Sequence, residues 1–138
     1  MDTINLRIVR PDRLVWTGEV HHLVLTTKTG ELGVWPMHAP EICALGDGVM
    51  RVYEGERGDQ ERRIIISGGY AEVNMHEVII LANHARISYD VKRDSVDRTK
   101  TKAERMLEQL GPNDHNRAYW VEKIAWCDLL SQYGEFSD

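Results

Sequence analysis

Residues 30–40 read GELGVWPMHAP, and no other stretch of the chain says as much about its fold. Two glycines, two prolines, a tryptophan and a histidine fall within these eleven residues, between two apolar stretches. Glycine opens backbone angles that other residues avoid, whereas proline fixes φ and removes a hydrogen-bond donor. The pattern predicts a turn at 29–32, a short strand at 33–35 and a loop of one fixed shape at 36–40. Such a loop, without a nucleophile or paired acids, favours a binding surface over a catalytic one.

On both sides of this loop, residues 2 to about 86 read as short strands. Ile4, Leu6 and Ile8 alternate with polar neighbours, and glycines mark the breaks between successive apolar runs. Further strands are predicted at 20–27, 49–53, 63–67, 70–74 and 78–81. Because no helical crossover fits the gaps between them, the pattern indicates an all-β sandwich or barrel. Gly68-Gly69 lies between two of these strands, which predicts a bulge or a close backbone approach and not a phosphate-binding loop.

After Tyr89 the apolar period changes from two to that of a helix. Val96, Ala103 and Leu107 share one helix face, Asp90 or Ser88 can serve as the N-cap, and Gly111-Pro112 can end the helix. A second helix, capped by Asp114 or Asn116, is predicted to run to about Tyr133. The short linker favours an antiparallel hairpin that packs on itself, on the sandwich or on a partner. We therefore predict two domains, residues 1–87 and 88–138.

Composition excludes several classes of protein. The chain has 138 residues and a net charge of -5, which provides no basic stripe for nucleic acid. Its two cysteines, Cys43 and Cys127, lie far apart and outside any CxxC motif, so they are read as reduced, packed thiols. No apolar run approaches the roughly 18–20 residues that span a bilayer, so we expect any membrane association to be indirect.

Motifs for catalysis or metal binding are not found in the sequence. It contains no HExxH, GxSxG, Walker or GxGxxG pattern, and its six histidines show no i, i+4 pair. His21 and His22 fall in the predicted strand 20–27, where neighbours point to opposite faces and cannot chelate one ion together. We therefore predict no catalytic residues and no metal site. Trp35, placed before Pro36 in the shaped loop, is the aromatic residue most available to a partner.

Four blocks of the chain together resemble one known family. They are IVRPDRLVWTGEV at 8–20, GELGVWPMHAP at 30–40, DGVMRV at 47–52 and SGGYAEVNMHEVIILAN at 67–83. In order and spacing they are similar to the epsilon subunit of rotary F-type ATP synthases, over roughly residues 4–89. The resemblance implies a ten-stranded β-sandwich followed by a two-helix hairpin. It implies a non-catalytic subunit of the central stalk, with no required cofactor.

The resemblance also implies partners and a location. The sandwich would bind the gamma subunit and rest on the ring of c subunits, coupling proton or sodium flow to rotation. The hairpin would reach the alpha and beta subunits and regulate ATP hydrolysis. The complex would hold the chain on the cytoplasmic face of the bacterial inner membrane. By similarity to the family's contact loop, the candidate partner-binding residues are Glu31, Trp35, Met37 and His38.

A regulatory nucleotide is known for some family members, whose motif resembles I-D-x-x-R-A with further arginines on both helices. Asp90 and Arg93 match the acid and the arginine, but Tyr89 precedes the acid and Asp94 replaces the alanine. The candidate ATP-binding residues are therefore Asp90, Arg93, Arg98, Lys100, Arg105 and Arg117. Lys102 on the first helix and Lys123 on the second are further cations that could reach phosphates.

The charge of the second helix departs from the strongly inhibitory members of the family. Residues 112–138 carry two basic and five acidic side chains, a net charge of -3, which disfavours contact with acidic segments of the beta subunits. We expect a weak electrostatic inhibitor of hydrolysis. The alternative reading of the whole chain is a free-standing β-sandwich module that binds a ligand or a protein, because fold alone does not fix function.

Overall fold

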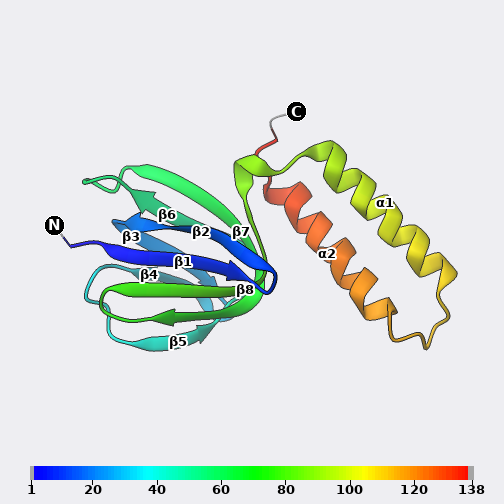
Figure 1. The fold of residues 1–138 in the computed structure, drawn as a ribbon, viewed down its shortest axis with the longest axis horizontal. Helices are drawn as coiled ribbons and strands as arrows, with labels where there is room; N and C mark the ends of the chain where they lie inside the picture. Colours follow the sequence, from blue (N-terminus) through cyan, green and yellow to red (C-terminus); the bar gives the residue numbers. More distant parts are fainter. Residues whose placement is uncertain (1, 137–138) are drawn as a thin grey trace. The chain divides into compact units, whose positions relative to one another are not determined.

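The computed structural model describes residues 2–136, and within them the chain divides into two compact units (Figure 1). Met1–Ile87 holds the strands, and Ser88–Asp138 holds the helices. The strands are β1 (Ile4–Arg10), β2 (Arg13–Val20), β3 (His22–Thr27), β4 (Gly30–Val34), β5 (Glu41–Ala44), β6 (Gly48–Glu54), β7 (Gln60–Val73) and β8 (Glu77–Ile87). The helices are η1 (Ser88–Asp90), α1 (Arg93–Gln109) and α2 (Arg117–Tyr133).

The first unit is a β-sandwich made from one continuous sheet. Its strands are hydrogen-bonded in the order β2-β1-β8-β7-β6-β3-β4, with β5 added to β7. β1 and β8 pair in parallel, and the other pairs in the described residues are antiparallel. The prediction of an all-β sandwich is confirmed, but the strand count of ten is wrong for residues 2–136, which hold eight. The predicted strands 63–67 and 70–74 are one strand, β7, which bends without breaking its ladder with β8.

That bend lies at Gly68-Gly69. Residues 60–66 of β7 pair with β6, whereas residues 70–73 pair with β5. At Gly69 the φ angle is +111°, and a Cβ built there would lie 2.0 Å from the carbonyl oxygen of Leu81 on β8. Only a residue without a side chain can bring two backbones so close at this angle. The glycine pair therefore lets one strand belong to both layers, and the predicted close backbone approach is confirmed.

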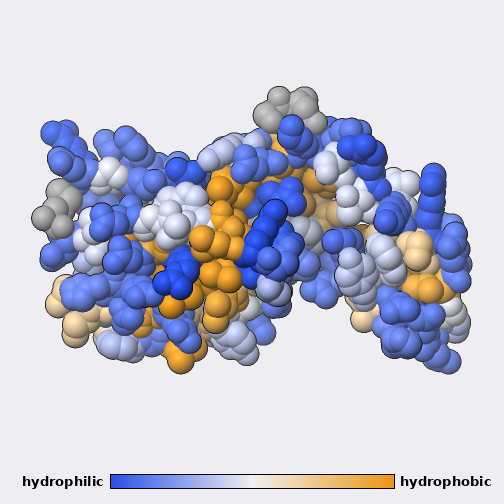
Figure 2. Space-filling view, viewed as in Figure 1, coloured by the Kyte–Doolittle hydropathy of each residue, from blue (hydrophilic) through white to orange (hydrophobic). Residues whose placement is uncertain are grey.

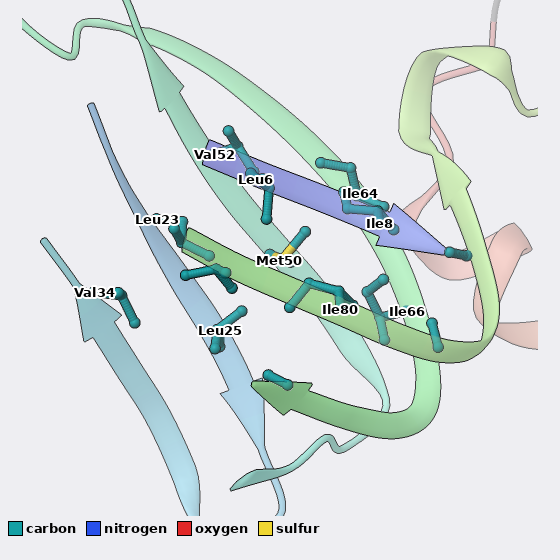
Figure 3. Close-up of a cluster of buried hydrophobic side chains, with 14 of the residues drawn as sticks. Leu6, Ile8, Leu23, Leu25, Val34, Met50, Val52, Ile64, Ile66 and Ile80 are labelled. Carbon is teal, nitrogen blue, oxygen red and sulfur yellow. The ribbon is translucent and has the colours of Figure 1, made fainter. Parts of the chain in front are cut away.

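The core lies between the two layers. Figure 3 shows side chains from β1, β3, β4, β6, β7 and β8 pointing toward one another, and Ile8, Leu23, Leu25 and Ile64 have no exposed surface. In β1 the buried positions are Ile4, Leu6 and Ile8, the alternation that the sequence predicts. Apolar burial of this kind contributes about 25 cal/mol per Å², so the interdigitated core is the main source of the sandwich's stability.

The second unit is a helical hairpin whose two helices pack on each other. Val96 and Ala103 of α1 are buried, as the sequence predicts, and Cys127 and Leu130 of α2 are buried as well. Lys100 Nζ lies 2.6 Å from Asp128 Oδ1 and ties the helices together at the surface. This hydrogen bond and the carboxylate charge raise the pKa of Lys100.

The open end of the hairpin is closed by the residues that follow α2. Ser88 is fully buried, its hydroxyl donates to the carboxylate of Glu135, and its carbonyl accepts from the Glu135 amide at 2.9 Å. The guanidinium of Arg93 lies 4.0 Å from the ring centroid of Phe136. The ends of the hairpin are thus fastened by main-chain, hydroxyl and cation–π contacts within this unit.

The predicted cap of the first helix is wrong, whereas Asn116, one of the two caps predicted for the second helix, is found at the N-cap position. Lys92 and Asn116 occupy the N-cap positions of α1 and α2, and neither makes a side-chain cap hydrogen bond. Asp90 and Ser88 lie instead in η1, before α1 begins. Asp114 accepts the amide of Asn116 at 2.8 Å, one residue before α2 begins. The hydroxyl of Ser88 is drawn into a tertiary contact, which the local pattern of the sequence does not encode.

The bend in β7 gives a direct test of what the glycine pair does. Gly69→Ala should lower the free energy of unfolding of the sandwich by about 3 kcal/mol or more, because a side chain at this φ meets the backbone of β8. Gly30→Ala is the matched control, since Gly30 also has a positive φ, +130°, but has no atom within 4 Å of the added Cβ. It should cost about 1 kcal/mol. Thermal unfolding followed by circular dichroism checks both; equal losses would contradict the role assigned to close approach.

Candidate functional site

The shaped loop lies in the sandwich unit, slightly displaced from its predicted position. The turn falls at Lys28-Thr29, and β4 runs from Gly30 to Val34, so the predicted bounds of the turn at 29–32 and of the strand at 33–35 are wrong by one to three residues. Trp35 therefore lies just beyond the strand and not within it. The reason is the pairing of β3 with β4, which extends the ladder to Thr27 opposite Gly30.

Trp35 folds back over the solvent-facing side of β3 and β4. A Cβ added at Gly33 would lie 2.6 Å from the Trp35 ring, so the bare glycine leaves the space in which the ring lies. The same ring stacks on His22 of β3, with centroids 4.6 Å apart and an interplanar angle of 7°. His22 in turn stacks on Tyr53 of β6 at 4.4 Å and 7°. Trp35 keeps half of its surface exposed, so it is both anchored and available to a partner.

His21 and His22 do not lie as the sequence predicts. β2 ends at Val20 and β3 begins at His22, so the predicted strand 20–27 is interrupted by a bend at His21. The bend turns the two imidazoles toward each other, and their Nδ1 atoms lie 2.8 Å apart. Burial, and then the neighbouring charge of His21, lower the pKa of His22. The prediction that the two side chains point to opposite faces is therefore wrong.

Glu31 points to the same solvent-facing side of β4 as Gly33, where the Trp35 ring lies. Its carboxylate pairs with Arg51 of β6 and keeps 62% of its side chain exposed. Across the next strand, Glu61 bonds Arg63 and accepts the hydroxyl of Tyr53 at 3.2 Å. The hydrogen bond from Arg63 is the main cause that lowers the pKa of Glu61. This face is thus an ordered surface of rings and ion pairs.

Met37 and His38 lie in the loop itself. Met37 has a φ of +70°, and its amide donates to the carbonyl of Met75 in the β7–β8 turn at 2.7 Å. This bond joins two turns that are far apart in sequence, and both methionines are about half exposed. His38 is partly exposed, with Nδ1 2.7 Å from the Ala39 carbonyl oxygen. The loop and the β7–β8 turn therefore together present two flexible apolar side chains and a histidine.

A second surface of the sandwich was missed by the sequence reasoning. On the outer face of β5, β7 and β8, Ile42 lies beside Glu72, and Glu72 beside Ile79. Tyr70 and Leu81 are cross-strand neighbours one row further along. We call these five residues the outer face.

Exposure marks the outer face as unusual. Ile42 is 71% exposed, Tyr70 59% and Leu81 45%. A groove of about 590 Å³ is lined by three of these residues, Ile42, Glu72 and Ile79. Figure 2 shows apolar side chains gathered over β1 and β8 on the face toward the viewer. The signal in the sequence is VIIL at 78–81, where a strand is apolar on both of its faces.

The candidate nucleotide residues do not converge on one place. Arg98 and Arg105 share a groove of about 450 Å³ along α1, lined also by Lys102. Lys100 is engaged with Asp128, and the guanidinium of Arg117 donates to the carbonyls of Leu107 and Leu110 at 3.1 and 3.3 Å.

The remaining pair of candidates lies at the other end of the hairpin. Asp90 is in η1, and Arg93 begins α1, where it lies against Phe136. Of the candidates, the structure thus brings together Arg98 and Arg105 along α1. Arg117 instead caps the last turn of that helix.

Metal and membrane signals are sparse in residues 2–136. No group of three or more histidine, cysteine, aspartate or glutamate side chains converges there in a way that could hold a metal ion. Cys43 and Cys127 are reduced thiols, and burial raises the pKa of Cys43. No helix in the described part of the chain is long and apolar enough to cross a membrane.

Comparison with known proteins defines the class. Residues 3–88 match the family model for the β-sandwich domain of the ATP synthase delta/epsilon chain. The chain belongs to the family of ATP synthase epsilon chains, as its resemblance implies. The epsilon chain of Synechocystis sp. is 38% identical over 107 residues, which cover 78% of this chain and 76% of the relative. The epsilon chain of Gloeothece citriformis is 32% identical over 124 residues, which cover 90% of this chain and 88% of the relative.

Solved structures agree with this fold. A chain in the mitochondrial ATP synthase of Euglena gracilis, a structure of OSCP, F1 and c-ring, superposes with a TM-score of 0.66 at 23% identity. The match covers 96% of this chain and 81% of that one. Chloroplast relatives, such as the epsilon chain of Psilotum nudum at 35% identity over 75% of this chain, extend the family beyond bacteria. This chain is therefore an epsilon-type subunit of an ATP synthase.

The hairpin provides a prediction that separates structural from ligand-binding arginines. Arg117→Met should destabilise the hairpin by about 1–3 kcal/mol, because it removes charge-assisted hydrogen bonds to the last carbonyls of α1. Arg98→Met, the control, removes only an exposed i,i+4 pair with Asp94 and should cost less than about 0.5 kcal/mol. Native-state hydrogen exchange of α1 amides measures both. Equal protection in the two variants would show that Arg117 does not fasten the helix end.

Proposed function

We propose that this chain is a non-catalytic subunit of the ATP synthase central stalk that links the gamma subunit to the c-ring during proton- or sodium-driven ATP synthesis. The observation that carries the proposal is the exposed outer face of the sandwich. A stalk subunit needs a stiff body with two binding surfaces, and a sandwich with a dry, interdigitated core supplies the stiffness. The shaped loop and the outer face supply two separate surfaces.

The outer face suits a large protein partner. Contiguous exposed apolar surface on a soluble domain marks an interaction site. Ile42, Tyr70 and Leu81 offer branched and aromatic side chains, and Arg7, beside Ile79 on the next strand, offers a charge for a polar rim. This arrangement of an apolar centre with a polar rim is typical of protein interfaces. We assign the gamma subunit to this face.

The shaped loop suits the c-ring. Met37 and Met75 offer unbranched, adaptable side chains that can follow an irregular partner surface. Glu31, Trp35 and His38 add charge, an anchored ring and hydrogen-bonding capacity near them. Contact with the membrane would then pass through the complex, which would place the chain peripherally at the membrane that holds the synthase.

The first test is gamma binding by the outer face. Ile42→Asp should weaken a one-to-one complex with the purified gamma subunit at least tenfold, because a charge replaces the most exposed apolar side chain of the surface. Tyr119→Asp, on the exposed side of α2, is the matched control and should bind as the unchanged chain does. A chain ending at Ile87 should also keep most of its affinity.

Calorimetric titration measures these affinities. Unchanged affinity of Ile42→Asp for the gamma subunit would contradict the assignment of gamma to the outer face. No binding by any variant, or by the full chain, would favour the alternative of a free-standing module that binds another ligand in this groove.

The hairpin is proposed to regulate ATP hydrolysis weakly, through contacts with alpha and beta subunits. Its second half carries a net charge of -3, so like charges oppose its approach to acidic segments. Comparing hydrolysis by the reconstituted complex containing full-length chain with one containing a chain ending at Gly111 should show a change of less than about threefold. A tenfold rise, which corresponds to about 1.4 kcal/mol of coupling, would show strong inhibition by the hairpin.

A regulatory ATP is the further part of this proposal. Its phosphates would meet Arg98 and Arg105 on the outer side of α1, where the exposed pair of Arg98 with Asp94 costs little to break. Arg98→Met, which should spare the hairpin, is therefore also the variant that should weaken ATP binding to the isolated chain.

A further inference from the structure

The outer side of β3 and β6 carries a three-ring stack that the proposed stalk role does not explain. His22 is the middle ring, parallel to Trp35 on one side and to Tyr53 on the other. Trp35 leads directly into the shaped loop, whereas Tyr53 is fixed in the β6 ladder. The Trp35 ring is therefore held on the sheet by stacking on the His22 imidazole and by its contact with the backbone at Gly33.

The middle ring is itself held by one hydrogen bond. His22 Nδ1 and His21 Nδ1 lie 2.8 Å apart, and such a contact needs a hydrogen on one nitrogen and a lone pair on the other. Two neutral rings satisfy this with opposite tautomers. One added proton also satisfies it, because an imidazolium donates to the remaining neutral ring, and charge strengthens the bond. A second proton places a hydrogen on both nitrogens, leaves no acceptor and sets two positive charges side by side.

The 55–59 loop holds the two histidines in this arrangement. A Cβ added at Gly58 would lie 2.7 Å from His21 Nδ1 and 3.1 Å from His22 Cε1, so the loop backbone passes directly over the pair. The His21 amide donates to the Tyr53 carbonyl at 2.8 Å, which fixes the bend to β6. Neither ring can turn away without moving the loop or breaking the stack.

Several charged groups surround the pair. Arg57 and Asp59 flank Gly58 in the loop, Tyr53 faces His22 and bonds Glu61 of β7, and Arg51 of β6 pairs with Glu31 of β4. Glu61 is also bonded to Arg63, so its charge is already balanced by a cation. The group that faces His22 Nδ1 is the imidazole of His21.

We propose that the His21–His22 pair is a proton-operated catch, which holds Trp35 on the sheet while the pair carries no more than one extra proton and releases it when both imidazoles are charged. Repulsion between the two N–H groups then expels His22 from the stack, and Trp35 loses the ring that it rests on. The shaped loop changes its presentation with pH. This last consequence, for partner binding, rests on the proposed stalk function; the catch itself does not.

The direction of the pH dependence follows from the burial of His22. Because the pKa of His22 is lowered in the folded chain, its neutral form is favoured there. The unfolded chain takes up the proton more readily. The contribution of His22 to the free energy of unfolding is therefore fully present above the ordinary pKa of histidine and is lost as the pH falls toward the lowered pKa. The catch should therefore be closed near neutral pH and open on acidification, before the sandwich unfolds.

The test follows Trp35 during acidification. The full chain is labelled with 5-fluorotryptophan, and its Trp35 resonance is identified by its loss in Trp35→Phe. Between pH 7.5 and 5 this resonance should shift with a midpoint below the range of a free histidine, while those of Trp16, Trp120 and Trp126 stay in place. A Trp35 resonance that moves only when all four move together, as in unfolding, would overturn the proposal.

Two histidine variants separate the parts of the catch. In His21→Asn the amide can donate or accept, so His22 keeps a partner in both of its charge states and the Trp35 shift should disappear. In His22→Asn the middle ring is gone, so Trp35 should be released at every pH. In His115→Asn, at an exposed position between the helices, the Trp35 resonance should shift with pH as it does in the unchanged chain. The same Trp35 shift in His21→Asn would overturn the proposal.

The loop variants test the geometry without changing a histidine. Gly58→Ala should force the pair apart and move the Trp35 resonance at pH 7.5 toward its acid position. Gly55→Ala shares the positive φ, but its added Cβ has no atom nearer than 3.5 Å, so Trp35 should stay in place. An unmoved Trp35 in Gly58→Ala would overturn the catch.

Gamma and c-ring binding measured at pH 7.5 and at the lower midpoint then shows whether partners sense the change. No binding at either pH would count against the stalk role alone.

Discussion

The close approach of β7 to β8 at Gly69 is the constraint on which the sandwich depends. There the backbone of one strand runs so near the carbonyl of Leu81 that no side chain fits, and β7 turns from the layer of β6 to the layer of β5. Without this turn the two halves of β7 would lie in one flat sheet, and the apolar side chains of both layers would have no opposite face. The core of Ile8, Leu23 and Ile64 exists because one strand serves both layers.

The same bend creates the two surfaces proposed to bind partners. Residues 70–73 of β7 carry Tyr70 and Glu72 outward beside β5 and β8, where the outer face forms. In the turn that follows β7, the Met75 carbonyl accepts the amide of Met37, which joins this turn to the shaped loop. A stalk subunit must resist torque between two partners, and surfaces built on one continuous sheet transmit load through its hydrogen-bond ladder and not through a hinge.

The two units fasten their parts in different ways. The sandwich relies on apolar burial and on backbone ladders, whereas the hairpin joins its helices by a modest apolar seam, an exposed Lys100–Asp128 pair and the cap of Arg117 on α1. The closure of the open end by Ser88 and Glu135 adds a buried polar contact. Polar fasteners of this kind respond to charge and solvent more than a packed core does, which fits a segment proposed to regulate and not to carry load.

The sequence by itself determined the fold class, the division near residue 87 and the family. It could do so because strand alternation, helix periodicity and the glycine–proline punctuation are local signals, and because four ordered blocks match the epsilon chains. The tertiary structure alone decided that 63–67 and 70–74 are one strand, that His21 and His22 face each other, that Ile42 and Tyr70 share an exposed face, and that Arg117 caps α1 instead of joining Arg98 and Arg105. These outcomes depend on contacts between residues distant in the chain, such as β3 with β6 or α2 with the end of α1, and local periodicity carries no record of which distant groups will meet.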